Sequence, residues 1–366
     1  MKTGWIQNIK GFGIMQQNRR ISKKRYLQSM AVAITAMLFI IIFVISIHCG
    51  SVSISVIHLL KQCMTENYDS SFQNISYIFF QVRLPRIVLC SLTGIALGLS
   101  GCIMQNLLRN PLASPFTLGV SNGASFGAAT AMILGNIFIQ KNFFFSGYSL
   151  IALNAFIFGC ISLGIVCFVA KFCKNNINIL VLTGTAVSSL FSAGVSILKY
   201  ISSSEALKNL DIWLMGGFWA ANWKAVAIIF PFILICFLFT VKLAWDFNAM
   251  NAGEDIAATL GVHVKYLKTL SLILVTLVSS ISIAFSGVIG FIGLVAPHIA
   301  RSLVGVDNRK LIPESAMIGG IILLVSDTIA RTIILPKELP VGIITSLIGV
   351  PFFIYILIRK KKIWGN

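Results

Sequence analysis

The amino-acid sequence predicts an all-α polytopic membrane protein with about ten transmembrane helices. Of its 366 residues, 57% are hydrophobic and only 11% are charged. A soluble domain has a largely polar surface and could not bury so much apolar surface, so lipid must be the solvent for most of the chain. The apolar residues also occur in runs of about 20, which is the length that an α-helix needs to cross a bilayer.

Ten apolar runs are the expected spans. In chain order they cover about 30–47, 87–105, 112–134, 148–170, 179–198, 225–241, 270–285, 287–296, 312–330 and 341–358. The eighth is short and interrupted by glycine, so we expect it to tilt or to follow a re-entrant path. Glycines spaced about one turn apart in the second and third runs predict close helix packing. These are Gly94, Gly98, Gly101, Gly119, Gly123 and Gly127.

The basic residues predict the topology. We expect a basic cytoplasmic tail over residues 1–28, a transmembrane region over 29–358 and a second basic tail over 359–366. With both ends in the cytoplasm, 20 of the 29 lysines and arginines lie on the cytoplasmic side, as the positive-inside rule requires. The net charge of +18 comes from short blocks between apolar runs, which indicates contact with anionic membrane lipid and argues against nucleic-acid binding.

Motifs for catalysis and for metal or cofactor binding are absent from the sequence. There is no GxxxxGK[ST] phosphate loop, and the four histidines are scattered. We therefore expect neither an enzyme nor a cofactor or metal site. Cys49 and Cys63 lie near the expected outer edge of the membrane and could pair, although two isolated cysteines are weak support for a disulfide.

Asp327 is the clearest ionisable residue inside an expected span. A lone charge at mid-bilayer costs about 2.5–3.5 kcal/mol, so a partner is expected. Arg331 lies four residues later on the same helix face, which predicts a structural ion pair. A role in proton coupling is the alternative, and the absence of a recognised second acid or histidine relay argues against it.

Several strings occur together over most of the chain. They are RLPR at 83–86, RNPLASP at 109–115, LGVSNGA at 118–124, GE at 253–254, LGV at 260–262, GFIGLVAPHIAR at 290–301 and ELPVG at 338–342. In this order they resemble the FecCD-type permeases of ABC importers for iron siderophores, haem and cobalamin. The basic segment before the first span is longer than in the shortest members of that family.

The resemblance implies the type II ABC importer permease architecture. In that arrangement two permease subunits, identical or different, enclose a central path in the bacterial cytoplasmic (inner) membrane. Two cytoplasmic ABC ATPase subunits drive transport, and an extracytoplasmic substrate-binding protein delivers the substrate. The expected function is ATP-driven uptake of an iron chelate, with iron-siderophores favoured, haem second and cobalamin third.

The polar segment 248–261 matches the coupling helices of the family, which sit in a groove of the ATPase. The residues expected to make or shape this contact are Gly253, Glu254, Asp255, Ala257, Leu260 and Gly261. The acids open a short amphipathic stretch, where a helix dipole favours negative charge. A solvated loop without a partner is the alternative interpretation.

The resemblance also implies a cytoplasmic gate at the junction of the second and third spans. Asn110, Pro111 and Leu112 occupy that junction, and the Asn-Pro bond excludes ordinary helix there. A looser alignment implies a second gate at Asn176 and Asn178, before the fifth span.

Three arginines are expected to receive the substrate-binding protein on the exterior. Arg83, Arg86 and Arg331 lie at the outer ends of spans, against the inside bias of the other basic residues. The resemblance implies that they grip glutamates on the two lobes of that protein, and the planar guanidinium suits a carboxylate. The alternative is that they anchor the helices at the lipid boundary.

Other functions remain as rivals. A secondary transporter driven by an ion gradient is the main alternative, and the scarcity of recognised intramembrane carboxylates argues against it. A membrane receptor would need an output domain that the sequence lacks. Manganese and zinc ABC permeases are the nearest structural rivals, but the strings at 83–86 and 109–115 fit them poorly.

Overall fold

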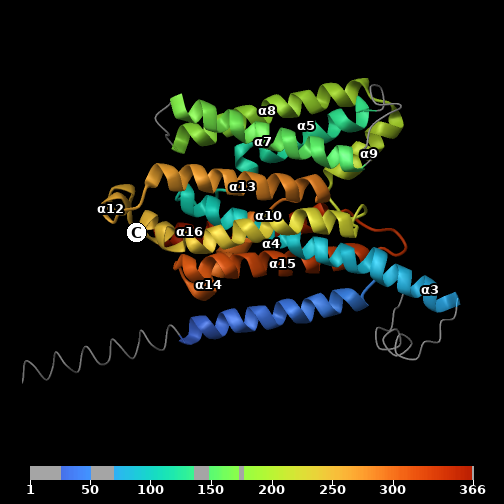
Figure 1. The fold of residues 1–366 in the computed structure, drawn as a ribbon, viewed down its shortest axis with the longest axis horizontal. Coiled ribbons are helices and arrows are strands. Elements are labelled where there is room, and N and C mark those ends of the chain that lie inside the picture. Colours follow the sequence, from blue (N-terminus) through green and yellow to red (C-terminus); the bar gives the residue numbers. More distant parts are fainter. Residues whose placement is uncertain (1–25, 51–69, 136–147, 173–176, 365–366) are drawn as a thin grey trace, which may run out of the picture.

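Every regular element in the described part of the chain is a helix, as Figure 1 shows. The computed structural model describes residues 26–50, 70–135, 148–172 and 177–364. The first helix is Tyr26–His48. The next elements are α3 (Ser70–Tyr77), a π-helix (Ile78–Arg83), α4 (Leu84–Leu107), a 3₁₀-helix (Pro115–Leu118), α5 (Val120–Ile133), α7 (Tyr148–Phe172), α8 (Ile177–Ile201) and α9 (Ser204–Leu214). The last are α10 (Trp223–Lys242), α11 (Ala244–Ala252), α12 (Glu254–Thr259), α13 (Val264–Ser286), α14 (Ile292–Val304), α15 (Asn308–Thr332) and α16 (Val341–Trp364).

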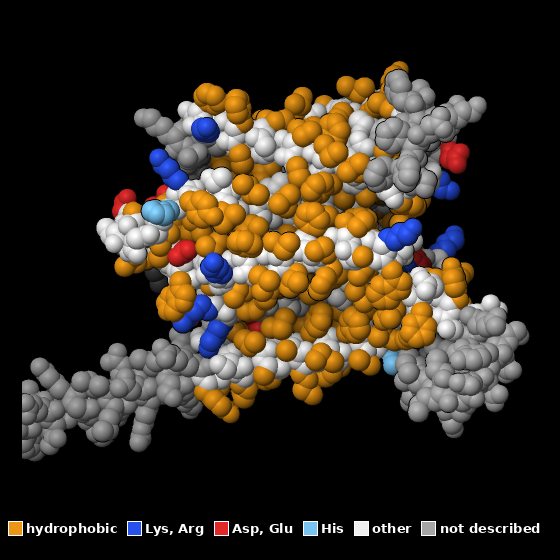
Figure 2. Space-filling view, in the orientation of Figure 1, with side chains coloured by type: hydrophobic (Ala, Val, Ile, Leu, Met, Phe, Trp, Pro, Cys, Tyr) orange, Lys and Arg blue, Asp and Glu red, His pale blue; other side chains and the backbone are white. Residues whose placement is uncertain are grey.

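The predicted polytopic helical architecture is confirmed. Seven described helices are long and apolar enough to cross a membrane, and two shorter apolar helices, Ile292–Val304 and Val341–Tyr355, accompany them. Together with α5, these helices match the ten predicted runs one for one. The space-filling view agrees, because a broad apolar band covers the middle of the visible face while charged side chains gather at its two ends (Figure 2).

Helix α4 lies at the centre of the bundle. In the most apolar 18-residue stretch of Asn74–Leu107, which includes α4, 83% of the residues are buried. In the first helix, at one edge of the bundle in Figure 1, only 11% of such a stretch is buried. Helices α10, α13, α14 and α15 pack around α4, and α5, α7 and α8 form a group on the other side of α13. The most central helix is therefore the one that carries the RLPR string at one end and the RNPLASP string just beyond the other.

The predicted glycine packing is also confirmed. A Cβ added at Gly94 would lie 2.5 Å from the carbonyl oxygen of Gly319 in α15, and one at Gly101 would overlap the backbone of Gly293 in α14. On the other side of the bundle, a Cβ at Gly123 would lie 2.6 Å from the carbonyl oxygen of Phe158 in α7. Backbones approach this closely only where no side chain intervenes.

The third and eighth runs differ in their boundaries from the prediction. Residues 112–119 form a loop and a 3₁₀-turn, so helix α5 begins only at Val120. The eighth helix begins at Ile292 rather than near 287, because Gly287 (φ 66°) and Phe291 (φ 67°) have left-handed backbone angles that no α-helix contains. It then runs through Pro297, whose missing N–H leaves the Gly293 carbonyl without its helical donor, and Gln105 Nε2 donates to that oxygen at 3.4 Å.

The two ends of the bundle are distinct. Helix α12, the C-terminus and the start of the first helix lie at one end, and α3 and α9 lie at the other (Figure 1). We call these the α12 end and the α3 end. Helix α16 continues to Trp364 and so extends into the predicted C-terminal tail over 359–366, whose cytoplasmic location stays a prediction. Of the predicted N-terminal tail, residues 1–25 lie outside the described residues.

Candidate functional site

A buried cluster of charges lies at the α3 end, between α4 and α15. Arg86 of α4 donates from Nη2 to Asp327 Oδ1 of α15 at 2.9 Å and from Nη1 to Glu338 Oε2 at 2.7 Å. Arg331 pairs with the other oxygen of Asp327, with 2.9 Å between Nε and Oδ2. Asp327 is fully buried, whereas the side chain of Glu338 is 30% exposed. Two arginines therefore share one buried carboxylate, and a second acid completes the cluster.

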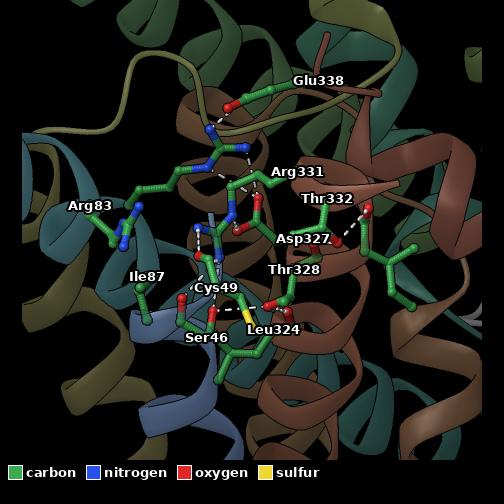
Figure 3. Close-up of polar contacts among 12 residues, drawn as sticks. Ser46, Cys49, Arg83, Ile87, Leu324, Asp327, Thr328, Arg331, Thr332 and Glu338 are labelled. Atoms are coloured by element: carbon green, nitrogen blue, oxygen red, sulfur yellow. Dashed lines mark hydrogen bonds and ion pairs between the residues drawn. The ribbon is translucent and has the colours of Figure 1, made fainter. Parts of the chain in front are cut away.

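Arg331 and a third arginine, Arg83, hold the end of the first helix (Figure 3). Arg331 donates to the Cys49 carbonyl oxygen at 3.0 Å and to Ser46 Oγ at 2.9 Å. Arg83 donates to the carbonyl oxygen of Ile47 at 3.1 Å. The last carbonyls of a helix have no donors within the helix and carry its negative dipole end, so cations are favourable partners there. The cluster thus joins the first helix, α4 and α15.

The structure brings together the three arginines predicted to dock a binding protein. All three are buried. Arg83 bonds to the end of the first helix, and Arg86 and Arg331 both pair with Asp327. The predicted Asp327–Arg331 pair is confirmed. The two acidic partners of Arg86 were missed, because they lie 241 and 252 residues away in the sequence. The docking role itself is not tested by this geometry and stays a prediction.

A second buried acid was also missed. Glu314, in the second turn of α15, is fully buried, and Thr35 Oγ1 of the first helix donates to its Oε1 at 2.7 Å. Its Oε2 has no hydrogen-bond donor among the described residues. The sequence did contain a signal, because an acid inside a predicted apolar run is costly unless it is paired.

The predicted gate residues form a compact turn between α4 and the 3₁₀-helix. Asn110 Oδ1 accepts a hydrogen bond from the N–H of Leu112 at 2.9 Å, which closes a side-chain turn over Pro111. The preceding residue, Arg109, has a left-handed φ of 45°. The loop ends where the Thr117 hydroxyl donates to the Ser114 carbonyl oxygen at 2.6 Å. These bonds fix the path of the chain at the α12 end.

The predicted second gate consists of Asn176 and Asn178. Asn176 lies outside the described residues, and Asn178 belongs to the first turn of α8. The structure therefore does not test the second gate, and both gates remain predictions.

The predicted coupling segment folds as two short helices, α11 and α12, joined at Gly253. Gly253 has a φ of 142°, which L-residues rarely adopt, so its place in the elbow depends on lacking a side chain. Glu254 and Asp255 occupy the first turn of α12, where the helix dipole favours acids, as predicted. Glu254 also accepts a hydrogen bond from Lys268 of α13 at 2.7 Å.

Helix α12 buries one residue and exposes others. Ala257 is fully buried, while Leu260 is 68% exposed and Gly261 follows it with a φ of 85°. Ile256 is also exposed. This short segment therefore directs two apolar side chains outward, beyond the apolar band.

Within the described ranges, no three His, Cys, Asp or Glu side chains gather in a way that would hold a metal ion. Cys49 is a free, partly buried thiol, and Cys63 lies outside the described residues.

Comparison with known proteins places this geometry in context. A family model described as the FecCD transport family matches residues 38–359. The hemin transport system permease protein of Yersinia pestis is 35% identical over 332 residues, which cover 88% of this chain and 95% of that protein. The molybdate import system permease protein of Haemophilus influenzae is 36% identical over 287 residues, covering 78% and 82% of the two chains.

A solved structure shares the same fold. It is assigned to a metal-chelate type ABC transporter in an inward-facing conformation, and it superposes with a TM-score of 0.78 at 33% identity, over 90% of this chain and 98% of that one. The motifs, the helices and these matches cover nearly the same residues. The protein is therefore a multi-pass membrane permease of an ABC importer of the metal-chelate class, and it belongs to the FecCD transport family.

Proposed function

We propose that the protein is the permease subunit of an ATP-driven importer that takes up an iron chelate, with ferric siderophores first, haem second and cobalamin third. The observation that carries this proposal is the elbow of α11 and α12, which presents exposed Ile256 and Leu260 outside the membrane band. The sequence has no phosphate loop of its own, so a separate ABC ATPase would supply the energy. The hemin permease of Yersinia pestis supports an iron-containing substrate, and the molybdate permease shows that related chains serve other substrates.

The experiment is reconstitution of the chain with the ATPase and the binding protein encoded beside it. Uptake into liposomes is measured with a ferric siderophore, haemin, cobalamin and molybdate, each with ATP and with an inactive ATPase variant. We expect ATP-dependent uptake of a ferric siderophore or haemin. Uptake of molybdate alone would refute the iron-chelate assignment while leaving the importer class intact.

The orientation and the assembly are part of the proposal. The α12 end would face the cytoplasm of a bacterium and carry both chain termini, and the α3 end would face the binding protein. A second permease subunit, identical or different, would complete the central path. Asn110, Pro111 and Leu112 would form the inner gate, with Asn176 and Asn178 at the second gate. Cysteines placed at 110 and 112 should then crosslink across the dimer and reversibly block transport.

Helix α12 would be the ATPase contact, with the residues named above from Gly253 to Gly261. An acid pair in the first turn and an exposed leucine at the end give it both charge and apolar surface. A Gly253→Ala change strains the elbow through its φ without filling occupied space, because the nearest side-chain atom lies 3.5 Å from the added Cβ. It should lower the number of substrate molecules imported per ATP more than it lowers membrane insertion.

The binding protein would dock over Arg83, Arg86 and Arg331. Arg86→Glu is a poor test, because it would place a third acid beside Asp327 and Glu338. Glu338→Gln is sharper, since it removes a competing carboxylate from Arg86 without burying a new charge. If Arg86 receives a glutamate of the binding protein, Glu338→Gln should tighten docking, and salt above about 0.15 M should weaken it. Unchanged affinity would favour helix anchors.

One observation supports a gradient-driven transporter as the second candidate. Helix α15 carries two fully buried carboxyls, Glu314 and Asp327, and proton-coupled carriers use such groups. Two arginines already neutralise Asp327, which weighs against this candidate. Uptake driven by a pH gradient into liposomes that hold the purified chain alone would establish it.

A further inference from the structure

An asparagine network lies at the α12 end, where α4, α11 and α15 meet. At its centre is Asn106 of α4, which is 4% exposed. Its Nδ2 donates to Asn308 Oδ1 of α15 at 2.7 Å, and its Oδ1 accepts from Asn251 Nδ2 of α11 at 3.2 Å. One side chain therefore joins three helices.

A second connection runs directly from α15 to α11. The backbone N–H of Asn308 donates to Asn248 Oδ1 at 2.9 Å, and Asn248 Nδ2 donates to Asp307 Oδ1 at 2.9 Å. Asn248 and Asn251 lie three residues apart and so project from the same side of α11. Helix α11 is thus attached to the start of α15 and to the end of α4 through side-chain amides.

Amide side chains suit this connection because each has a donor and an acceptor in one plane. Asn106 and Asn248 use both groups, so each bond fixes the direction of the next. Hydrogen bonds among buried groups are stronger than in water and costly to leave unmade. The apolar neighbours on α11, including Phe247 and Met250, are buried too, but the hydrophobic effect is non-directional, whereas hydrogen bonds fix a direction.

The network lies between the two segments that the proposed function must connect. On one side, α11 continues through Gly253 into α12, which Glu254 and Lys268 hold to α13. On the other side, Asn106 is the penultimate residue of α4 and lies four residues before Asn110 of the gate turn. A displacement of α11 would therefore act on the end of α4 through hydrogen bonds of fixed direction.

We propose that Asn106, Asn248 and Asn308 are positioning residues that transmit movement of the α11–α12 elbow to the gate turn. The proposal rests on the proposed function, because it needs an ATPase at α12 and a gate at Asn110. The simpler alternative is that the amides only satisfy one another inside the bundle. That alternative predicts a loss of stability when the network is broken, without a change in the substrate imported per ATP.

The first test is Asn106→Leu in the complete importer reconstituted in liposomes. Leucine has a similar size and makes no hydrogen bond, so both links through Asn106 are lost. Two such bonds correspond to about a tenfold change in an equilibrium. We expect ATP hydrolysis stimulated by the loaded binding protein to stay near the parent rate, while substrate imported per ATP falls about tenfold.

Asn154→Leu is the matched control. Among the described residues, the Asn154 side chain bonds only within its own helix, where Nδ2 donates to the Leu150 carbonyl oxygen of α7 at 3.0 Å. Its ratio of substrate to ATP should equal that of the parent. Should Asn106→Leu fail to insert, Asn251→Ala takes its place, because Asn251 is exposed and contributes a single bond worth about threefold.

The double variant Asn106→Leu with Asn308→Leu shows whether the residues act as one unit. The side-chain link of Asn308 is already lost in Asn106→Leu, so the double variant should be no worse than Asn106→Leu alone. A parent ratio in both Asn106→Leu and Asn251→Ala would overturn the inference, as would an equal fall in ATP hydrolysis and import. If the parent complex imports no substrate with ATP, the proposed function fails instead.

Discussion

Trp223, the first residue of α10, donates its indole N–H to the carbonyl oxygen of Phe80 at 2.8 Å. Phe80 lies in the π-helix Ile78–Arg83, where the N–H of Leu84 bonds to Phe79, five residues back. The next donor in that register would be residue 85, which is a proline without an N–H. The indole therefore occupies the position of the missing donor and holds the π-turn that carries Arg83 into α4.

The Trp223–Phe80 bond leads to the first prediction. Trp223→Phe keeps a ring at the site but leaves the Phe80 carbonyl without this donor, so we expect a loss of about 0.5–1.5 kcal/mol in stability. Thermal unfolding of the purified protein in detergent measures it. Trp219→Phe is the control, because the Trp219 indole has no acceptor among the described residues. Equal effects of the two changes would show that the ring, and not the hydrogen bond, matters.

The charge cluster at the α3 end gives the second prediction. Asp327→Asn leaves the buried guanidiniums of Arg86 and Arg331 around a neutral amide, and breaking a buried pair in this way costs about 3–5 kcal/mol. Glu338→Gln should cost less than about 1 kcal/mol, because Glu338 is partly exposed and Arg86 keeps Asp327. Asp327→Asn should therefore unfold at a clearly lower temperature than Glu338→Gln. A similar loss in both would mean that Asp327 is not the centre of the cluster.

The sequence predicted the helical elements because hydrophobic length reports directly on membrane spans. It also predicted the Asp327–Arg331 pair, which needs only the helical period. It placed the start of the third helix too early, because apolar residues such as Leu112 and Ala113 also occur in the loop before α5. Hydrophobicity alone does not distinguish a buried loop from a helix.

The polar contacts between distant segments could not be predicted in the same way. Arg86 meets Asp327 across 241 residues, and Asn106 meets Asn308 across 202. No periodicity connects such positions, and only the packing of α4 against α15 brings them together. The glycines were the one indirect signal, since Gly94 and Gly98 indicated that α4 lies close to a neighbouring backbone without indicating which one.

The contact between α4 and α14 gives the third prediction. Gly101→Ala would place a methyl group on the Gly293 backbone, which cannot move aside as a side chain can. We expect a loss of about 1–3 kcal/mol and a lower yield of folded protein. Gly164→Ala is the control, because no heavy atom lies within 4 Å of the added Cβ and alanine favours the helix more than glycine. If Gly101→Ala unfolds at the parent temperature, the close approach is wrong.

The buried acid Glu314 gives the fourth prediction. Thr35→Val removes the described donor to Glu314 Oε1, and an unsatisfied buried acceptor costs about 1–3 kcal/mol. In a Glu314→Leu background the same change should cost little, because no acceptor remains to be satisfied. Thermal unfolding of the parent, the two single variants and the double variant gives the coupling. Additive effects would contradict a direct hydrogen bond between the first helix and α15.

Asp307, which caps α15 at the α12 end, gives a prediction about pH. Its Oδ1 accepts from the Arg309 backbone N–H at 3.1 Å, and its two oxygens accept from the Arg309 guanidinium. The side-chain hydrogen bonds from Arg309, assisted by that from Asn248, lower the pKa of the Asp307 carboxyl below its ordinary value, against a smaller opposing effect of burial. The carboxylate should therefore stay ionised throughout the physiological range.

A depressed folded-state pKa fixes the sign of the pH dependence. The stability from Asp307 is fully present above its unfolded pKa of about 3.9 and is lost only as the pH falls through the lower folded value. Asp307→Ala removes the helix cap and should cost about 1 kcal/mol, by the same amount at pH 5, 6.5 and 8. Thermal unfolding of both proteins at the three pH values measures it, with Asp255→Ala as a control that lacks a described hydrogen-bond partner. A difference that shrinks between pH 8 and pH 5 would show that the carboxyl takes up a proton in this range, contrary to the hydrogen bonds that hold it ionised.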